Sequence, residues 1–191
     1  NINQVGGIRY DLNDSTIKQA NDLITYLRPK LDEYFDVISQ DEIFIKRTKN
    51  IGVISKKLAS ESGGSGPVAR GSGINFDLRK DSPYEKYSEL EFIVPIGQIG
   101  DAYDRTMVRM KETIQSLNIC EQVLDKLPQG PISSRKPIKS AKLLKPPKGS
   151  HYKAIESPRG ELGFFIVSDG TSIPYRMKIR APSFSNLSIV E

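Results

Sequence analysis

The spacing of apolar residues changes along this 191-residue chain and divides it into a helical part and a strand-forming part. Between residues 101 and 127 apolar side chains recur every three or four positions. They are Tyr103, Met107, Met110, Ile114, Leu117 and Leu124, with Cys120, Val123 and Leu127 widening the stripe. This period predicts one amphipathic helix roughly 40 Å long, and Pro128 and Gly130 are expected to end it.

Further helices are predicted on the N-terminal side of this long one. A helical spacing of apolar residues runs over 13–38, and short helices are predicted over 41–48 and 55–61. Pro29 lies inside the first of these segments. We expect it to break or kink the helix, because proline lacks the amide hydrogen that the helical ladder needs.

After residue 150 the apolar residues alternate with polar ones, which is the period of a β-strand. Strands are predicted over 151–155, 161–168 and 175–181, and Asp169-Gly170 is a turn signal before the last of them. Helices followed by such strands predict an α+β fold, mainly helical with one long helix, followed by a small antiparallel β meander. We expect one structural domain, with a helical part over 1–132, a connector over 133–150 and a β part over 151–191.

The net charge of +5 arises in one short stretch of the chain. Residues 126–155 carry eight Lys or Arg and no acid, whereas the rest has a slight excess of acids. Several prolines also fall there, so we expect residues 133–150 to lack regular structure and to lie on partner subunits or in water. The basic residues are not interleaved with aromatic ones, which argues against nucleic acid as a partner. A non-enzymatic interaction domain that uses this connector stays open as an alternative.

Several kinds of reactive site are excluded by the residues that the chain contains. One cysteine, Cys120, and one histidine, His151, cannot form a zinc or iron–sulfur site by themselves. The glycine-rich segment follows neither the phosphate-loop nor the dinucleotide-binding pattern. No run of about 18 apolar residues is present, so no segment is expected to span a membrane. We therefore expect no metal, flavin or nicotinamide to be bound by this chain.

The glycine-rich segment over 62–73 is flanked by charges of both signs. Apolar and charged residues follow its second half directly, which predicts an ordered, tightly turned loop. A second group of charges opens the long helix, and the two groups would form a buried network if the loop packs there. We expect Arg70 or Arg79 to bind Asp77, Asp101 or Asp104. Such a network would either position the loop or take a direct part in chemistry, and the sequence leaves both open.

Four segments together resemble a known family, and they occur in its order. The first three are residues 6–12 (GGIRYDL), 66–84 (GPVARGSGINFDLRKDSPY) and 94–105 (VPIGQIGDAYDR), and the fourth is a C-terminal set made of 156–163 (ESPRGELG), 167–170 (VSDG) and 174–182 (PYRMKIRAP). They are similar to the signatures of the D subunit of respiratory complex I, the NADH:quinone oxidoreductase. This family is distantly related to the large subunits of nickel–iron hydrogenases.

The resemblance implies a peripheral subunit of a proton-pumping, quinone-reducing translocase. It would lie on the cytoplasmic face of the cell membrane, or on the matrix side in mitochondria, and reach the membrane only through its partners. It would form part of the wall of the quinone chamber beside the iron–sulfur subunit, and it would contact the C subunit. NADH and quinone would be used by the complex, and the iron–sulfur clusters and FMN would belong to partner subunits. We assign no catalytic and no metal-binding residue, and expect the interface near the chamber to be ordered by Arg70, Asp77, Arg79, Asp104 and Arg105.

Two departures from the family pattern qualify the resemblance. The family's quinone-headgroup His and Tyr would precede Asn1, and its C-terminal helix would follow Glu191. We therefore expect this chain to be part of a longer protein and to be inactive alone. Other members of the family carry a longer helical insert where this chain has only the connector. The shorter connector resembles archaeal or hydrogenase-related versions. The nearest alternative is thus a fragment of the large subunit of a membrane-bound energy-converting hydrogenase, which would need two Cys pairs for nickel and iron.

Overall fold

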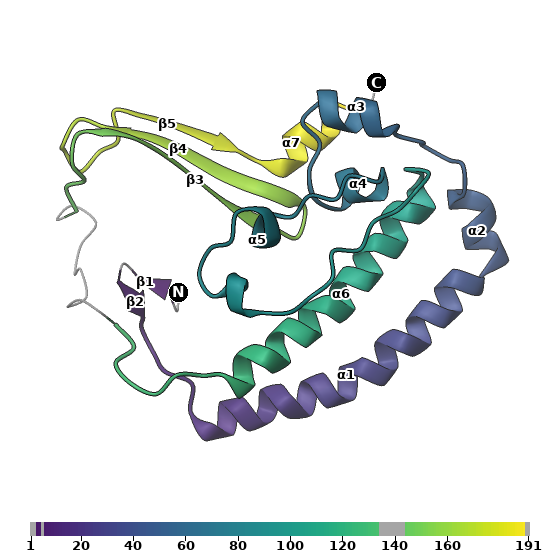
Figure 1. Cartoon of the computed structure of the whole chain (residues 1–191), viewed down its shortest axis with the longest axis horizontal. Helices are drawn as coiled ribbons and strands as arrows, with labels where there is room; N and C mark the ends of the chain where they lie inside the picture. The colour runs from purple at the N-terminus through teal and green to yellow at the C-terminus, as the bar shows by residue number, and fades with distance from the viewer. Residues whose placement is uncertain (1–2, 5, 134–143, 190–191) are drawn as a thin grey trace.

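The computed structural model describes residues 3–4, 6–133 and 144–189, and its elements lie in layers (Figure 1). Helix α1 (Asp14–Gln40) forms one outer side and packs along α6 (Ala102–Asp125). Next come α4 (Gly66–Gly71), which packs on α6, and α5 (Leu78–Asp81). The outer layer opposite α1 is a three-stranded sheet, whose strand β3 (Gly149–Ser157) contacts α5. The predicted α+β class is confirmed.

Helix α1 starts where Asn13 caps it, with its side-chain oxygen accepting from the amide of Thr16 at 2.8 Å. The predicted break at Pro29 is wrong, because the helix runs through this residue to Gln40. Proline removes one helical hydrogen bond, but the neighbouring turn is held to α6 by Arg28, which binds Glu121 at 2.6 Å and Asn118 at 3.0 Å. Packing along α6 therefore outweighs the local preference.

Helix α6 is the long helix that the apolar spacing predicts, and Asp101 caps its first turn. Its burial differs from the predicted single stripe: Met107, Val108 and Ile119 are its buried residues, whereas Cys120 and Val123 are exposed. The reason is that α6 is covered by α1 as well as by α4. Burial shared between two sides does not follow one stripe.

Shorter elements connect these two helices. Helices α2 (Glu42–Thr48) and α3 (Lys56–Glu61) match the predicted ranges, and the side chains of Asp41 and Ser55 cap them. The 3₁₀ turn η1 (Tyr87–Glu89) follows α5. After it, Leu90 and Phe92 pack on Ile119 of α6 and form an apolar cluster beside α5. This cluster fixes the segment that leads from α5 back to the start of α6.

The sheet is an antiparallel meander in the order β3-β4-β5. Strands β4 (Gly160–Ser168) and β5 (Arg176–Arg180) complete it, close to the predicted ranges. Asp169 follows β4 and accepts a hydrogen bond from the amide of Thr171 at 2.9 Å, as expected of a turn residue. The register pairs Ile155 with Leu162, and it pairs Phe164 and Ile166 with apolar residues of β5.

Several elements were not predicted from the sequence. They are the two-residue strands β1 (Asn3–Gln4) and β2 (Gly7–Ile8), the helices α4 and α5, the turn η1, and helix α7 (Pro182–Leu187) after the sheet. Most of the predicted connector, residues 134–143, lies outside the described residues. Within the rest of it, Ser133 bridges to Gly7, residues 144–148 form no helix or strand, and Gly149 and Ser150 belong to β3.

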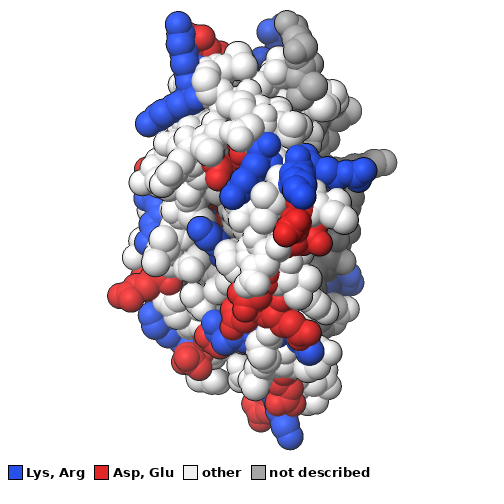
Figure 2. All heavy atoms as spheres, turned by 90° about the vertical axis from the view of Figure 1, so that its right-hand side faces the viewer, with Lys and Arg blue, Asp and Glu red and all other residues white. Residues whose placement is uncertain are grey.

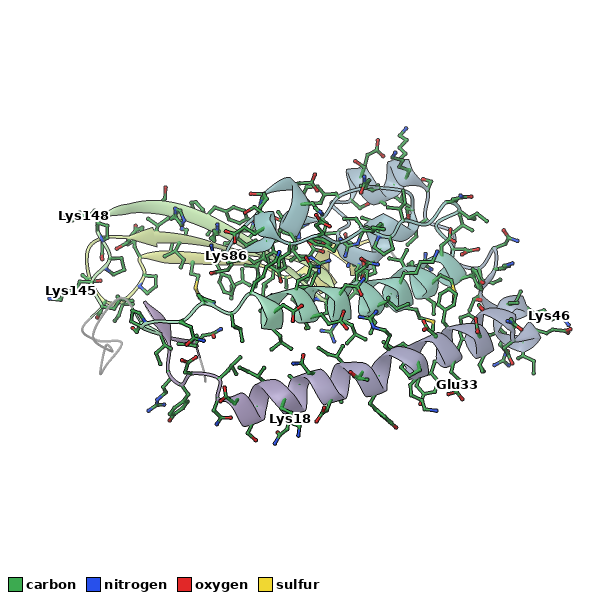
Figure 3. All side chains as sticks on the ribbon, turned by 60° about the horizontal axis from the view of Figure 1, so that its bottom comes forward. Lys18, Glu33, Lys46, Lys86, Lys145 and Lys148 are labelled. Carbon is green, nitrogen blue, oxygen red and sulfur yellow. The ribbon has the colours of Figure 1, made fainter. Side chains whose placement is uncertain are left out.

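The surface carries charges of both signs. Figure 2 shows Lys and Arg side chains next to Asp and Glu side chains on the face that forms the right-hand side of Figure 1. Figure 3 shows Lys18 and Glu33 of α1 and Lys46 of α2 pointing away from the body of the protein. Across the described residues, no helix combines the length and the apolar character needed to cross a membrane.

Candidate functional site: a buried ionic cluster

Arg70, in the last turn of α4, has a guanidinium group buried among carboxylates, with its side chain only 2% exposed. Its Nε donates to Glu112 of α6, and its Nη1 donates to Glu156 of β3 at 2.9 Å. The same Nη1 donates to the carbonyl oxygen of Phe76 at 3.0 Å and lies 3.5 Å from Oδ2 of Asp77. One side chain therefore joins α4, α6, the sheet and the segment before α5.

Asp77 forms a second, bidentate pair with Arg79 at the start of α5. Nε and Nη2 of Arg79 donate to the two carboxylate oxygens of Asp77 at 2.9 and 2.7 Å, and the Arg79 amide donates to Oδ1 at 2.9 Å. Burial alone raises the pKa of Asp77, but the hydrogen bonds and charge of Arg79 outweigh it and hold that pKa below its usual range. Asp77 is therefore ionised and works as the cap of α5.

Glu112 and Glu156 complete what we call the Arg70 cluster. Its members are Arg70, Asp77, Arg79, Glu112 and Glu156. Glu156 also accepts from the amide of Leu78 at 3.2 Å, which ties β3 to α5. Burial raises the pKa values of both Glu112 and Glu156 above the usual range, although the charge of Arg70 acts in the opposite direction.

Close backbone contacts bring Arg70 to this position. A Cβ on Gly66 would lie 2.5 Å from the Cα of Gly160, at the turn between β3 and β4. A Cβ on Gly71, at the other end of α4, would lie 2.8 Å from the Cγ of Arg105. Glycine is therefore required at both ends of α4, because any larger residue would push the helix away from the sheet or from α6.

Asp104 and Arg105 form a separate arrangement at the start of α6. Oδ2 of Asp104 accepts from the amides of Gln98, Ile99 and Gly100, at 2.9, 2.6 and 3.1 Å. Arg105 donates to the carbonyl oxygen of Gly100 at 2.6 Å. The two side chains thus hold the loop before α6 through its backbone.

The structure confirms that Arg70 and Arg79 bind one of the three predicted acids, which is Asp77. Asp101 does not join them; it caps α6 and accepts from the amide of Asn50 at 2.8 Å, while Asp104 binds loop amides. Glu112 and Glu156 were not predicted from the sequence to belong to the network. A signal existed for Glu156, which opens the ESPRGELG segment, whereas Glu112 falls between predicted stripe positions of a helix with many polar residues.

The pKa of Asp104 leads to a pH-dependent prediction. Burial alone raises it, but the three amide donors outweigh burial and hold the pKa below its usual range. Stabilisation by this carboxylate is thus complete above the unfolded pKa of about 3.9 and is lost as pH falls through the lower folded value. Asp104→Asn should lower the free energy of unfolding by about 2 kcal/mol at neutral pH, with a smaller difference below about pH 4. Urea unfolding at both pH values tests this, and a difference independent of pH would contradict it.

The Arg70 cluster fixes the positions of the elements around it. Every carboxylate in it already binds a guanidinium group, and such buried pairs fix geometry more than they add stability. Within the described ranges no group of three or more His, Cys, Asp and Glu side chains could hold a metal ion. The arrangement therefore holds α4, α5, α6 and strand β3 in fixed relation to one another.

Comparison with known proteins agrees with the motifs. The sequence model of the family described as respiratory-chain NADH dehydrogenase, 49 Kd subunit, matches residues 1–191. The D subunit of the NADH-quinone oxidoreductase of Dehalococcoides mccartyi is 44% identical over 191 residues, which are all of this chain and 51% of that protein. The D subunit of the same enzyme from Desulfotalea psychrophila is 45% identical over 186 residues, 97% of this chain and 49% of that protein.

A solved structure gives the same result in three dimensions. A chain of the membrane-bound sulfane sulfur reductase, an archaeal respiratory membrane complex, superposes with a TM-score of 0.87 at 40% identity. The match covers 94% of this chain and 49% of that chain. The present chain thus spans about half the length of the relatives it matches. With a family match over all of residues 1–191, the chain belongs to the family of the 49 kDa subunit of respiratory-chain NADH dehydrogenase.

Proposed function

We propose that this chain is part of a peripheral subunit of a quinone-reducing, proton-pumping NADH dehydrogenase complex, where it helps to form the quinone chamber. The observation that carries the proposal is the family match over residues 1–191, with relatives that are NADH-quinone oxidoreductase D subunits. Its partners are the iron–sulfur subunit next to the chamber and the C subunit. The complex uses NADH and quinone, and its FMN and iron–sulfur clusters belong to other subunits. The proposed location is the cytoplasmic face of the membrane, or the matrix side in mitochondria.

An exposed apolar sheet face supports a role inside an assembly. The cross-strand pairs of Ile155 with Leu162, Phe164 with Ile179, and Ile166 with Met177 lie on one face of the sheet. Met177 is 53% exposed and Ile179 is 51% exposed. A contiguous, half-exposed apolar face of this kind fits contact with a partner.

In this proposal the charged residues order the chamber wall without reacting. Arg70, Asp77 and Arg79 hold α4, α5 and α6 in register with the sheet, while Asp104 and Arg105 hold the loop before α6. Their role is positional, because the hydrogen bonds and ion pairs of these side chains join them to other protein groups.

An assay of the assembled complex tests this role at Arg105. Arg105→Ala frees the carbonyl oxygen of Gly100 from its 2.6 Å contact and loosens the loop before α6. NADH:quinone reduction should fall by about tenfold to a hundredfold, because a displacement of about 1 Å near a reacting group can cost about a hundredfold. Reduction of a hydrophilic artificial acceptor, which takes electrons before the quinone, should stay unchanged. Lys111→Ala, an exposed cation on the same helix, is the matched control. Equal loss with both acceptors, or no loss with either, would contradict a role at the chamber.

A related respiratory complex with another substrate is the second candidate. The similarity to the archaeal sulfane sulfur reductase chain, at 40% identity and a TM-score of 0.87, favours it. Turnover assays of the assembled complex distinguish the two candidates. Turnover of quinone with NADH supports the first, and turnover of a sulfane sulfur substrate without quinone reduction supports the second.

A further inference from the structure

The Arg70 cluster contains more carboxylates than guanidinium groups. Arg79 and Asp77 form a bidentate pair, so their charges balance. Arg70 is then left between Glu112 and Glu156, with Nε on the first and Nη1 on the second. One buried guanidinium cannot neutralise two ionised carboxylates, and an uncompensated buried charge is costly. Binding of a single proton removes the excess.

The contacts of the two carboxylates show which one can take that proton. Glu156 is 4% exposed and uses both oxygens, one on Arg70 and the other on the amide of Leu78. Glu112 is 15% exposed and uses only Oε1, on Nε of Arg70. Among the described residues, Oε2 of Glu112 accepts no hydrogen bond. Protonation of this oxygen preserves every contact of the cluster, whereas protonation of Glu156 turns an acceptor into a donor.

A partly open cavity of about 330 Å³ gives solvent a route to Glu112. Its lining includes Glu112, Thr113 and Ser116 of α6, Glu156 and Ser157 of β3, and Arg79 of α5. A space of this size is large enough for several water molecules. Protons can therefore exchange between bulk water and the carboxylate of Glu112.

No other charged group around Glu112 in the described part of the chain neutralises the excess negative charge of the Arg70 cluster. Arg70 comes from α4, Asp77 and Arg79 come from the start of α5, and Glu156 comes from β3. Arg109 of α6 also lines the cavity, but it is exposed and its guanidinium donates to the carbonyl oxygen of Arg105. Tyr87 also lines the cavity.

We propose that the Arg70 cluster is a proton-binding site, with Glu112 carrying the proton and the adjacent cavity supplying it. Protonation converts the carboxylate of Glu112 to a carboxylic acid, whose hydroxyl faces the cavity while Oε1 keeps its bond to Arg70. The raised pKa of Glu112, caused by burial, agrees with this placement. The site goes beyond the proposed function, because proton binding by Glu112 is a property of this chain and requires neither quinone nor partner subunits.

Infrared difference spectroscopy of the full-length protein tests the proposal, because the carbonyl stretch of a protonated carboxyl group is distinct. As pH is lowered, a band should grow at a pH above the usual glutamic acid value of about 4.3. Glu112→Gln, which keeps an oxygen for Arg70, should abolish this band. The matched control is Glu121→Gln on the same helix, where the carboxylate is half-exposed and paired with Arg28, and it should leave the band unchanged.

A second variant separates the two carboxylates of the cluster. In Glu156→Gln, Arg70 faces Glu112 alone, so the band of Glu112 should move to lower pH by about one unit or more. A band that persists in Glu112→Gln, or that disappears in Glu156→Gln, would place the proton elsewhere and overturn the proposal. The absence of any carboxyl group that titrates above the usual range would also overturn it. None of these readouts depends on quinone reduction, so they stand apart from a failure of the proposed function.

Discussion

Replacing Arg70 with methionine should lower the free energy of unfolding by about 3–5 kcal/mol, the cost of leaving buried charges without their partner. Methionine replaces the unbranched aliphatic part of arginine but provides no donor for Glu112, Glu156 or the carbonyl oxygen of Phe76. The two glutamates then lie buried without a counter-charge, which raises their folded pKa values further. Acids with raised folded pKa values favour the folded state when protonated. The variant should therefore regain stability as pH falls, and urea unfolding across pH measures both effects.

Two comparisons make the result at Arg70 specific. Arg28→Met removes another Arg–Glu pair, which joins α1 to α6, but its side chains are 36% and 44% exposed, so the loss should stay below about 1 kcal/mol. Adding Glu112→Gln and Glu156→Gln to Arg70→Met should restore part of the stability, because the unpaired charges are gone. If Arg70→Met and Arg28→Met cost the same, the Arg70 cluster does not hold the fold together as described.

Gly66→Ala should also destabilise the fold strongly, through backbone contact rather than charge. Gly66 has a φ of +63°, and a Cβ there would lie 2.5 Å from the Cα of Gly160 and 2.6 Å from the carbonyl oxygen of Arg159. The left-handed conformation costs about 1–2 kcal/mol for a residue with a side chain, and forcing α4 away from the sheet costs about 1–3 kcal/mol more. Thermal or urea unfolding should therefore show a loss of about 2–5 kcal/mol.

Gly63 is a closely matched control for this prediction. Its φ of +65° is almost the same, but nothing lies within 4 Å of the position that its Cβ would occupy. Gly63→Ala should therefore carry the conformational cost alone, about 1–2 kcal/mol. Equal losses at the two positions would mean that α4 does not depend on close contact with the β3–β4 turn.

Local signals explain which elements were predictable from the sequence. Helix α6 was predicted nearly to its ends, because Asp101 provides a cap and Pro128 stops the apolar pattern. The strands were predicted because their apolar residues alternate. Helix α4 was not, because its sequence, Gly66–Gly71, has poor helix propensity and is stabilised by packing on α6 and the sheet. At Pro29 the local signal predicted a break that does not occur, because contact with α6 keeps α1 continuous there.

In the Arg70 cluster, too, contacts between residues close in sequence could be predicted and long-range contacts could not. Arg70, Asp77 and Arg79 fall within one short segment, so their mutual contacts could be predicted from opposite charges close in sequence. Glu112 and Glu156 lie 42 and 86 residues beyond Arg70. Only the packing of α6 and β3 against α4 and α5 brings them to it. Long-range partners of a buried charge are set by tertiary structure, which no local pattern contains.

We propose that this chain is a positional part of a larger electron-transfer complex, and we expect it to carry no redox centre of its own. An iron–sulfur donor needs about four thiolate ligands, and Cys120 is the single cysteine of the chain. A flavin or nicotinamide site needs a phosphate-binding loop at the start of a helix, and no such motif is present in the sequence.

The most direct test measures the visible spectrum of the purified chain together with its quinone reduction from an artificial electron donor. We expect no stoichiometric iron, nickel or flavin signal, and turnover no faster than the protein-free rate. Activity should appear only when the full subunit is assembled with its iron–sulfur partner. A stoichiometric cofactor signal, or turnover by the isolated chain above the protein-free rate, would show that the chain holds a redox centre of its own.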